Sequence, residues 1–278
     1  MDAVDDPNAK LTVRQATKIY RTASGDLVAI DRCNLDVRAR EIVSIVGPSG
    51  CGKTTLLWSM SGLHGLTAGE VRLDGKPITG PNPEIGMVFQ DANLLPWRNL
   101  DSNIAFPFEI KGGKPDRAWV DHLMHRVGLD GFGAKMPREL SGGMQQRAAL
   151  VRALSFKPSV LLMDEPFGAL DSFTREEMNR LVEEIWMETP TTIVLITHSI
   201  EEAVFLSDRV VVMSPRPGRV ASIHPVPFPR PRSIEIMTTR EVFDLMTTIK
   251  LEIVGERKSL SAPKPAAPPS AALDRAAS

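Results

Sequence analysis

One glycine-rich run, Gly47-Pro48-Ser49-Gly50-Cys51-Gly52-Lys53-Thr54, restricts the fold of this chain more than any other segment. It matches the pattern G-x-x-x-x-G-K-[ST] in full, after the apolar run 41–46 and before a segment of helical character. The pattern needs a strand, a tight turn and a helix in that order, because glycines let backbone N–H groups turn inward onto phosphate oxygens. It therefore predicts an α/β core that binds a phosphorylated ligand.

The chemistry of this loop gives its last residues separate roles. The helix that follows adds positive potential at its N-terminus. Lys53 is expected to reach the β- and γ-phosphates of a nucleotide, and Thr54 to ligate Mg²⁺. Nucleotide contacts are expected from Gly47, Pro48, Ser49, Gly50, Cys51, Gly52, Lys53, Thr54 and Thr55. The position of Cys51 predicts that alkylation of its thiol competes with ATP; the alternative for the whole run is a chance glycine-rich turn.

Two acids, Asp164 and Glu165, end the apolar run 160–163. Strand ends of this kind face the ligand crevice of an α/β sheet. Asp164 is expected to hold Mg²⁺, and Glu165 to orient or deprotonate an attacking water. The alternative is that both acids only solvate the end of a strand.

A second glycine pair follows Ser141. Ser141 is a plausible N-cap for a helix over 141–156, and Gly142 and Gly143 leave its first amides open. This predicts a second anion site, against the alternative of an ordinary capped helix.

The rest of the chain predicts alternating strands and helices. Strand patterns occupy 11–13, 27–30, 35–37 and 41–46, with turn residues at 24–26, and a helix is expected from 53 to about 63. Further strands are expected at 70–73 and 85–89, and residues 99–138 look mostly helical, with breaks at Pro107, Gly112-Gly113 and Gly131. Helices at 141–156, 173–188 and 200–206 then alternate with strands at 160–164, 192–196 and 209–213, as parallel α/β units do.

Length and composition exclude several classes of protein. The chain has 278 residues and a formal net charge of −1, which gives no global electrostatic case for nucleic acid. Cys33 and Cys51 are too few for a disulfide framework or a zinc site, and they fit a reducing cytoplasm. Residues 1–10 contain no signal peptide, and no apolar run approaches the ~18 residues that span a bilayer.

The run Leu140-Ser141-Gly142-Gly143-Met144-Gln145-Gln146-Arg147 resembles the signature motif of ABC-transporter ATPase subunits. Four further residues follow that family's order: Gln90 is similar to its Q-loop glutamine, Asp171 to its D-loop aspartate, His198 to its switch histidine and Tyr20 to its adenine-stacking aromatic. The resemblance covers about residues 11–225. It implies an α/β P-loop NTPase fold with a RecA-like core, an N-terminal antiparallel β subdomain and an α-helical signature subdomain over about 91–156.

The resemblance also implies how the residues act. Two copies of the chain would pair head to tail, with each ATP between the phosphate loop of one copy and the signature of the other. Ser141 and Gly143 would contact the γ-phosphate bound by the partner. Gln90 would sense Mg²⁺ and the attacking water and relay to membrane subunits, while His198 would hold the γ-phosphate and Glu165 would be the catalytic base.

Three segments narrow the resemblance. Leu95-Pro96-Trp97-Arg98-Asn99-Leu100 and Ser214-Pro215-Arg216-Pro217-Gly218-Arg219 resemble the nitrate, sulfonate and taurine importer branch, as does the later Pro229-Arg230-Pro231-Arg232. This implies a peripheral ATPase on the cytoplasmic face of the inner membrane that energises import of a small anionic solute. Its expected partners are transmembrane permease subunits and, indirectly, a substrate-binding protein, with no nucleic acid.

The predicted organisation is an ATPase domain over 11–225, a C-terminal extension over 226–258 with a helix from Arg240 to Ile253, and disordered ends at 1–10 and 259–278. Two other functions are alternatives. A soluble ABC ATPase acting on DNA or ribosomes would carry a long coiled-coil insertion or two ATPase domains, and neither pattern is present. An ATP-binding scaffold without turnover is opposed by intact Lys53, Asp164, Glu165 and His198. Trp97 is either a core aromatic or part of a groove for the membrane subunits.

Overall fold

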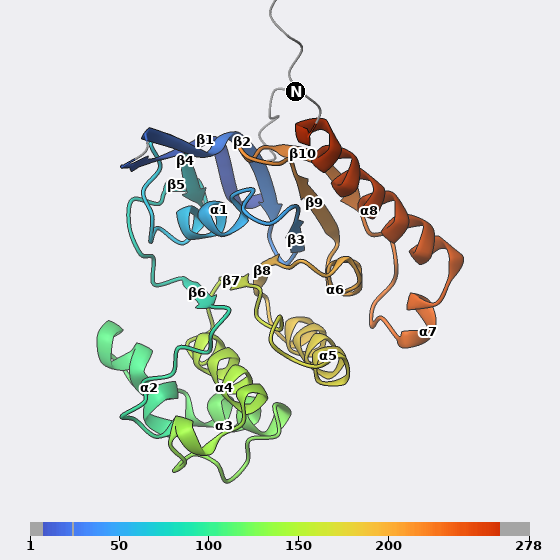
Figure 1. Cartoon of the computed structure of the whole chain (residues 1–278). Coiled ribbons are helices and arrows are strands. Elements are labelled where there is room, and N and C mark those ends of the chain that lie inside the picture. The colour runs from blue at the N-terminus through green and yellow to red at the C-terminus, as the bar shows by residue number, and fades with distance from the viewer. Residues whose placement is uncertain (1–7, 24, 262–278) are drawn as a thin grey trace, which may run out of the picture.

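The computed structural model describes residues 8–23 and 25–261, which form two β-sheets and a separate group of helices (Figure 1). The smaller sheet comes mostly from the N-terminal part of the chain. It has the strand order β2-β1-β4-β5 and is antiparallel throughout. Its strands are β1 (Ala9–Thr22), β2 (Gly25–Arg38), β4 (Ala68–Leu73) and β5 (Lys76–Pro77).

β1 and β2 are longer than the short strands that the sequence predicts. Polar residues separate the apolar runs, so the sequence does not show that each strand is continuous. These interruptions accompany shifts in the β1–β2 register between Val13 and Ala16 and again between Ala16 and Lys18. β1 also begins at Ala9, so the prediction that residues 9 and 10 are disordered is wrong. Residues 1–7 lie outside the described part of the chain.

The larger sheet carries the phosphate loop. Its order is β10-β9-β3-β8-β7-β6, with β10 antiparallel to β9 and every other pairing parallel. Every residue of β3, β7 and β8 is buried, which is typical of parallel strands covered on both faces. The strands are β3 (Ile42–Val46), β6 (Ile85–Val88), β7 (Val160–Asp164), β8 (Thr192–Ile196), β9 (Arg209–Met213) and β10 (Val220–Pro225).

The helices lie on both sides of this sheet and below it in the view of Figure 1. The predicted alternation of helix and strand from the signature to β9 is confirmed. The helices of the core are α1 (Lys53–Met60), α5 (Ser172–Glu188) and α6 (Ile200–Leu206), and those of the signature region are α2 (Leu100–Lys111), α3 (Arg117–Arg126), a short 3₁₀ helix (Pro137–Glu139) and α4 (Gly142–Leu154).

Pro107 does not break the helix in which it lies, so that prediction is wrong. α2 continues from Leu100 to Lys111 through the proline. A proline inside a helix removes one backbone hydrogen bond. Packing of α2 on α4 offsets this loss: Leu100 and Ile104 are buried in one core cluster with α4 residues, and the Ser155 hydroxyl donates to the Ile104 carbonyl at 3.5 Å.

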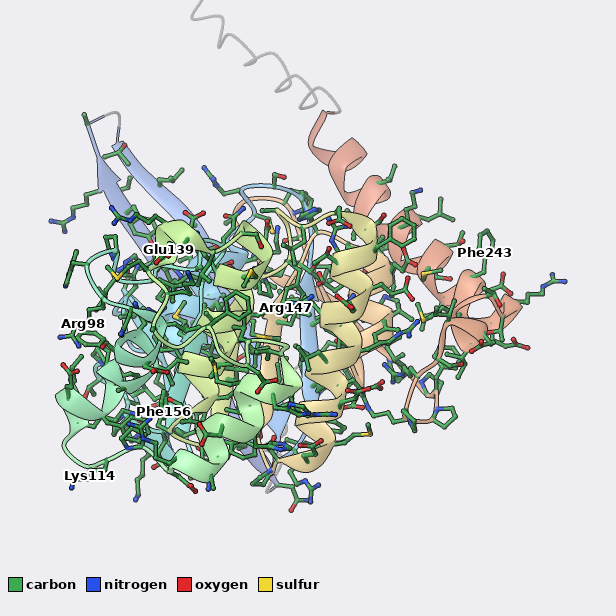
Figure 2. All side chains as sticks on the ribbon, turned by 90° about the horizontal axis from the view of Figure 1, so that it is seen from below. Arg98, Lys114, Glu139, Arg147, Phe156 and Phe243 are labelled. Atoms are coloured by element: carbon green, nitrogen blue, oxygen red, sulfur yellow. The ribbon has the colours of Figure 1, made fainter. Side chains whose placement is uncertain are left out.

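The C-terminal extension is ordered as far as Ser261. It contains α7 (Ile234–Met237) and α8 (Arg240–Ser261), so the last helix runs beyond the predicted end at Ile253. Val242 and Ile249 of α8 are buried against the core, whereas Phe243 points outward (Figure 2). The prediction that residues 259–278 are disordered is wrong for 259–261, which belong to α8, and residues 262–278 lie outside the described part of the chain.

Arg232 anchors the proline-rich connector before these helices. It is 3% exposed, and its Nη1 donates to the carbonyls of Val204, Phe205 and Ser207 at 2.7–2.8 Å. Burial lowers its pKa to about 10. Within the described residues, no helix is long and apolar enough to cross a membrane.

Candidate functional site

The phosphate loop lies between β3 and α1, as predicted. Gly50 and Gly52 adopt positive φ values of 74° and 106°, a region that other residues enter only at a cost. A Cβ on Gly52 would also lie 2.7 Å from the Ala29 carbonyl oxygen. Gly52 stands at the N-cap of α1 without a side-chain hydrogen bond, so the first amides of that helix remain open to an anion.

Lys53 is folded back over its own loop. Its Nζ donates to the carbonyls of Gly47 at 3.1 Å and Pro48 at 3.2 Å, and the residue is 7% exposed. A buried ammonium needs such acceptors. A phosphate in the loop is a stronger, charged acceptor, so Lys53 can exchange these carbonyls for phosphate oxygens.

Thr54 and Asp164 form a pair of oxygen donors at the base of the loop. The Thr54 hydroxyl donates to Asp164 Oδ1 at 3.1 Å, and Asp164 is 7% exposed at the carboxyl end of β7. Burial raises the pKa of Asp164, an effect that a nearby cation would oppose. One hydroxyl and one carboxylate suit Mg²⁺, which takes few protein ligands and completes its shell with phosphates and water.

Glu165 and His198 face each other across the ends of β7 and β8. Glu165 Oε2 and His198 Nδ1 lie 3.3 Å apart, and both side chains reach solvent. Glu165 has a positive φ of 45°, and its N–H donates to the Ile196 carbonyl at 2.9 Å. Strained backbone of this kind occurs at sites where a side chain must be aimed. The pair can polarise or deprotonate a small molecule placed between them.

The strand order explains why distant motifs meet. β3, β8, β7 and β6 are consecutive and parallel, so their carboxyl ends share one edge of the sheet. The phosphate loop follows β3, His198 follows β8, Asp164 and Glu165 end β7, and Gln90 follows β6. Ligands of open α/β sheets bind at this edge.

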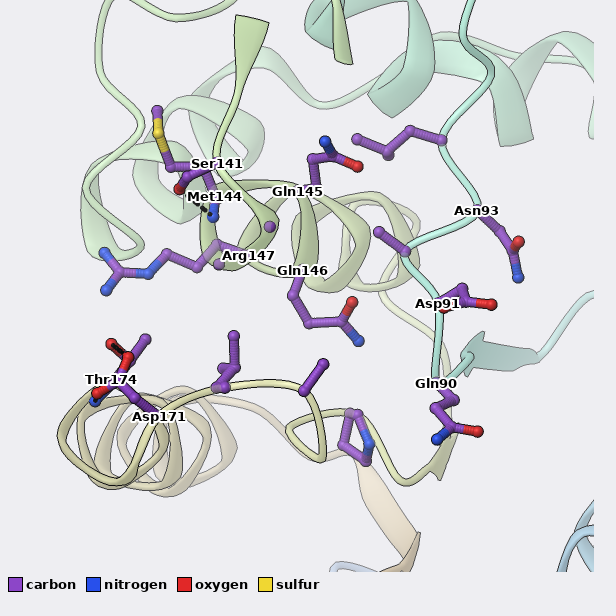
Figure 3. A pocket seen from close by; sticks show the side chains of 17 residues that line it. Gln90, Asp91, Asn93, Ser141, Met144, Gln145, Gln146, Arg147, Asp171 and Thr174 are labelled. Atoms are coloured by element: carbon purple, nitrogen blue, oxygen red, sulfur yellow. Dashed lines mark hydrogen bonds between the residues drawn. The ribbon is translucent and has the colours of Figure 1, made fainter. Parts of the chain in front are cut away.

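The signature lines a separate cavity of about 710 Å³ (Figure 3). The Ser141 hydroxyl accepts from the Met144 N–H at 3.3 Å, which makes Ser141 the N-cap of α4, as predicted. Gly142 opens the helix, and no side chain approaches the position that its Cβ would take. The wall consists of Gln90, Asp91, Ala92, Asn93, Leu94, residues 141–147, Pro166, Ala169, Leu170, Asp171 and Thr174.

Gln90 belongs to this cavity. Its side chain is exposed on the wall opposite the signature (Figure 3), and the described residues give it no hydrogen bond to Thr54 or Asp164. Gln146, which the sequence did not single out, donates its Nε2 to the Phe89 carbonyl at 3.0 Å. The signature helix thus holds the backbone just before Gln90. The position of Gln146 inside the signature is the sequence signal that points to this contact.

Asp171 caps α5. Its carboxylate accepts from the N–H groups of Phe173 and Thr174 at 3.1 Å and from the Thr174 hydroxyl at 2.7 Å. These hydrogen bonds, that of the Thr174 hydroxyl first, lower the pKa of Asp171. Asp171 therefore stabilises the start of α5, in addition to the role toward a nucleotide that the sequence predicts.

The two candidate anion sites of one chain do not meet. None of the residues 47–55 lines the cavity at the signature. Ser141 precedes α4 in the group of helices, and the phosphate loop lies between β3 and α1 at the edge of the large sheet (Figure 1). A phosphate held by the loop of one copy therefore does not reach the signature of the same copy in this arrangement.

Tyr20 is engaged with His64 and not with the phosphate loop. Its hydroxyl and His64 Nδ1 are 3.1 Å apart, and the two rings pack edge to face with centroids at 6.3 Å. His64 in turn packs edge to face against Trp58 of α1 at 4.8 Å. Lys18 Nζ lies 5.2 Å from the centroid of the Tyr20 ring. The structure leaves the proposed stacking on adenine as a prediction.

Exposure decides the sequence-based expectations for Cys51 and Trp97. Cys51 is 1% exposed, and burial raises the pKa of its thiol, so it has neither the access nor the thiolate that alkylation requires. The prediction that alkylation competes with ATP therefore loses its basis. Trp97 is 72% exposed, which excludes the core alternative.

The family model described as ABC transporter matches residues 30–168. The taurine import ATP-binding protein TauB of Roseobacter denitrificans is 49% identical over 221 residues, covering 78% of this chain and 82% of that protein. An uncharacterized ABC transporter ATP-binding protein of Methanocaldococcus jannaschii is 42% identical and covers 91% of this chain and 96% of its own length.

Solved structures agree with these relatives. A dimeric ATP-binding cassette in a post-hydrolysis state with ADP and Pi superposes with a TM-score of 0.70 at 31% identity, covering 78% of this chain and 99% of that one. The expected P-loop NTPase fold of the ABC ATPase class is thereby confirmed. The chain belongs to the ABC transporter family, among its ATP-binding proteins.

Proposed function

We propose that this chain is the ATP-hydrolysing subunit of a membrane importer for a small anionic solute of the aliphatic sulfonate, taurine or nitrate type. The observation that carries the proposal is the 49% identity to a taurine import ATP-binding protein over most of both chains. The chain acts from the cytoplasmic face of the inner membrane as a peripheral subunit.

In this proposal ATP binds to the phosphate loop. The loop residues 47–55 surround the phosphates, Lys53 donates to the β- and γ-phosphates, and Tyr20 leaves His64 to stack on adenine. Thr54, Asp164 and Gln90 would hold Mg²⁺, and the ion would neutralise negative charge on the phosphates. The open N-terminus of α1 and the 3.1 Å Thr54–Asp164 contact support this arrangement.

Glu165 and His198 carry the hydrolytic step. Glu165 accepts the proton of the attacking water, because its carboxylate lies at the same strand ends as the phosphate loop. His198, 3.3 Å from that carboxylate, orients Glu165 and donates to the γ-phosphate. The bond that forms joins the water oxygen to the γ-phosphorus, and the bond that breaks joins that phosphorus to the oxygen bridging to ADP.

A second copy of the chain completes each site. Ser141, Gly142, Gly143 and Asp171 of the signature cavity approach the γ-phosphate that the other copy holds. Transmembrane permease subunits receive the resulting movement through the segment after Gln90, where Trp97 is exposed. A substrate-binding protein selects the solute outside the membrane, so that the solute never touches this chain.

Lys53→Ala tests the assignment of the phosphate loop. A charged hydrogen bond contributes about 1.5–3 kcal/mol, so we expect ATP and ADP affinity to fall roughly ten- to hundredfold. Titration of a fluorescent nucleotide into the purified variant measures this, with Lys135→Ala on the exposed surface as the control. Unchanged affinity in Lys53→Ala would remove the loop from the nucleotide site.

Deletion of the gene for this chain tests the solute class. We expect loss of growth on taurine, another aliphatic sulfonate or nitrate as sole sulfur or nitrogen source, with normal growth on sulfate and ammonium. Complementation by the parent gene restores growth, and complementation by Lys53→Ala does not. Normal growth of the deletion strain on all these sources, with uptake of labelled solute intact, would contradict the proposed solute class.

A further inference from the structure

The segment Ser214-Pro215-Arg216-Pro217-Gly218-Arg219 has no role in the site described so far. It joins β9 to β10 and closes on itself through a hydrogen bond from the Ser214 N–H to the Arg219 carbonyl at 2.9 Å. The segment nevertheless lies directly against the phosphate loop. A Cβ on Gly218 would stand 2.0 Å from the Cys51 carbonyl oxygen, so only glycine fits at that contact.

The side chain of Arg216 binds a backbone carbonyl of the phosphate loop. Its Nε and Nη2 donate to the Gly50 carbonyl at 3.0 Å and 2.8 Å, across 166 positions of sequence. Gly50 is one of the loop residues with positive φ, at 74°. Two donors from one planar guanidinium fix both the position and the direction of that carbonyl.

The segment that presents Arg216 is itself fixed. The Gly218 N–H donates to the Ala29 carbonyl at 3.0 Å, and the Gly218 carbonyl accepts from the Asp31 N–H at 2.9 Å. Arg219 Nε donates to Asp31 Oδ2 at 3.1 Å. Arg216 therefore acts from a support that is hydrogen-bonded to β2, which reduces the entropy lost when its side chain binds.

Two cationic side chains thus donate to different carbonyls of the loop. Lys53 holds Gly47 and Pro48, and Arg216 holds Gly50. If Lys53 transfers to phosphate, the Gly47 and Pro48 carbonyls lose the lysine as a donor, and within the described residues Pro48 keeps only the Cys51 N–H at 3.3 Å. The contact of Arg216 with the Gly50 carbonyl does not depend on Lys53. We propose that Arg216 is a positioning residue that keeps the phosphate loop open and correctly turned for nucleotide. This inference rests on the proposed assignment of that loop to ATP.

Arg216→Ala in the full-length chain tests the inference. The side chain is exposed, so its interactions are partly screened and the substitution leaves the fold intact. We expect the Kd for ATP and for ADP to rise by about the same factor, roughly five- to tenfold, with faster nucleotide dissociation. The KM for ATP should rise equally, while kcat at saturating ATP changes less than about twofold, because no group at the reacting atoms is lost.

Three variants make the result specific. Arg216→Lys keeps the charge but not the forked geometry, and we expect it to recover less than half of the loss in binding free energy. Arg240→Ala, an exposed arginine on α8, should change nothing, and thermal melting should match the parent for all three arginine variants. Lys53→Ala, measured beside them, tests the nucleotide site itself.

Either of two results would overturn the role of Arg216. One is unchanged affinity for ATP and ADP in Arg216→Ala while Lys53→Ala still loses binding. The other is a loss that is several times larger for ATP than for ADP and is fully rescued by lysine, since long-range attraction of phosphate charge would then be the cause. If Lys53→Ala also binds normally, the assignment of the loop to ATP fails instead.

Discussion

Glu165→Gln is expected to bind ATP with an affinity within about twofold of the parent and to hydrolyse it at least about a hundredfold more slowly, the lower range for loss of a general base. The amide has the shape of the carboxylate, so the contact with His198 and the strained backbone at φ 45° can persist. The change removes the group that we assign as proton acceptor for water. It removes no group that we assign as a phosphate ligand.

The rate of phosphate release and an equilibrium titration of ATP measure the two effects separately. Glu201→Gln, an exposed acid in the first turn of α6, is the matched control and should hydrolyse ATP at the parent rate. With hydrolysis blocked, ATP should also hold two copies together, so the variant should elute as a dimer when ATP is added. Hydrolysis by Glu165→Gln at the parent rate would remove Glu165 from its role.

Ser141→Arg is the second large effect. Ser141 lies on the cavity of the signature, away from residues 47–55, so an arginine there should leave ATP binding to the single chain within about twofold. The long side chain fills the space that the partner's γ-phosphate would occupy. We therefore expect ATP-dependent dimerisation to be lost and hydrolysis to fall at least about a hundredfold, as for loss of an essential oxyanion contact.

A stability effect must be separated from this result. Ser141 caps α4 through the Met144 N–H, and loss of an N-cap costs about 1 kcal/mol. Ser141→Ala removes the same cap but adds no bulk, so its melting temperature should match that of Ser141→Arg while it still dimerises with ATP. Equal loss of dimerisation in both variants would show that the bulk of the arginine is not the cause, and that loss of the cap or of the serine contact to the γ-phosphate is.

The sequence predicted the larger sheet well because its signals are local. β3, β7 and β8 are continuous apolar runs that end in polar or glycine-rich turns, and each was recognised from its own residues. The order of motifs along the chain then matched one family. Because β3, β8, β7 and β6 are neighbours in the sheet, the motifs that follow them lie at one edge.

The misses come from contacts that no local pattern encodes. Pro107 stays inside α2 because distant residues pack on that helix. β10 forms by antiparallel pairing with β9, and Arg232 pins the connector after it to α6. Arg216 touches Gly50 from 166 positions away, so its role was invisible in the sequence. The position of Cys51 in a loop predicts that its thiol is accessible, whereas the fold buries it.

The central claim is that the signature of one copy serves the ATP of the other, and one measurement addresses it directly. Light scattering with and without ATP should be recorded for Glu165→Gln and for the double variant Glu165→Gln/Ser141→Arg, together with their ATP affinities. The account predicts equal ATP affinity for both, a dimer for the single variant and a monomer for the double one. Loss of ATP binding by the monomeric double variant would place the signature in its own subunit's site and contradict the account.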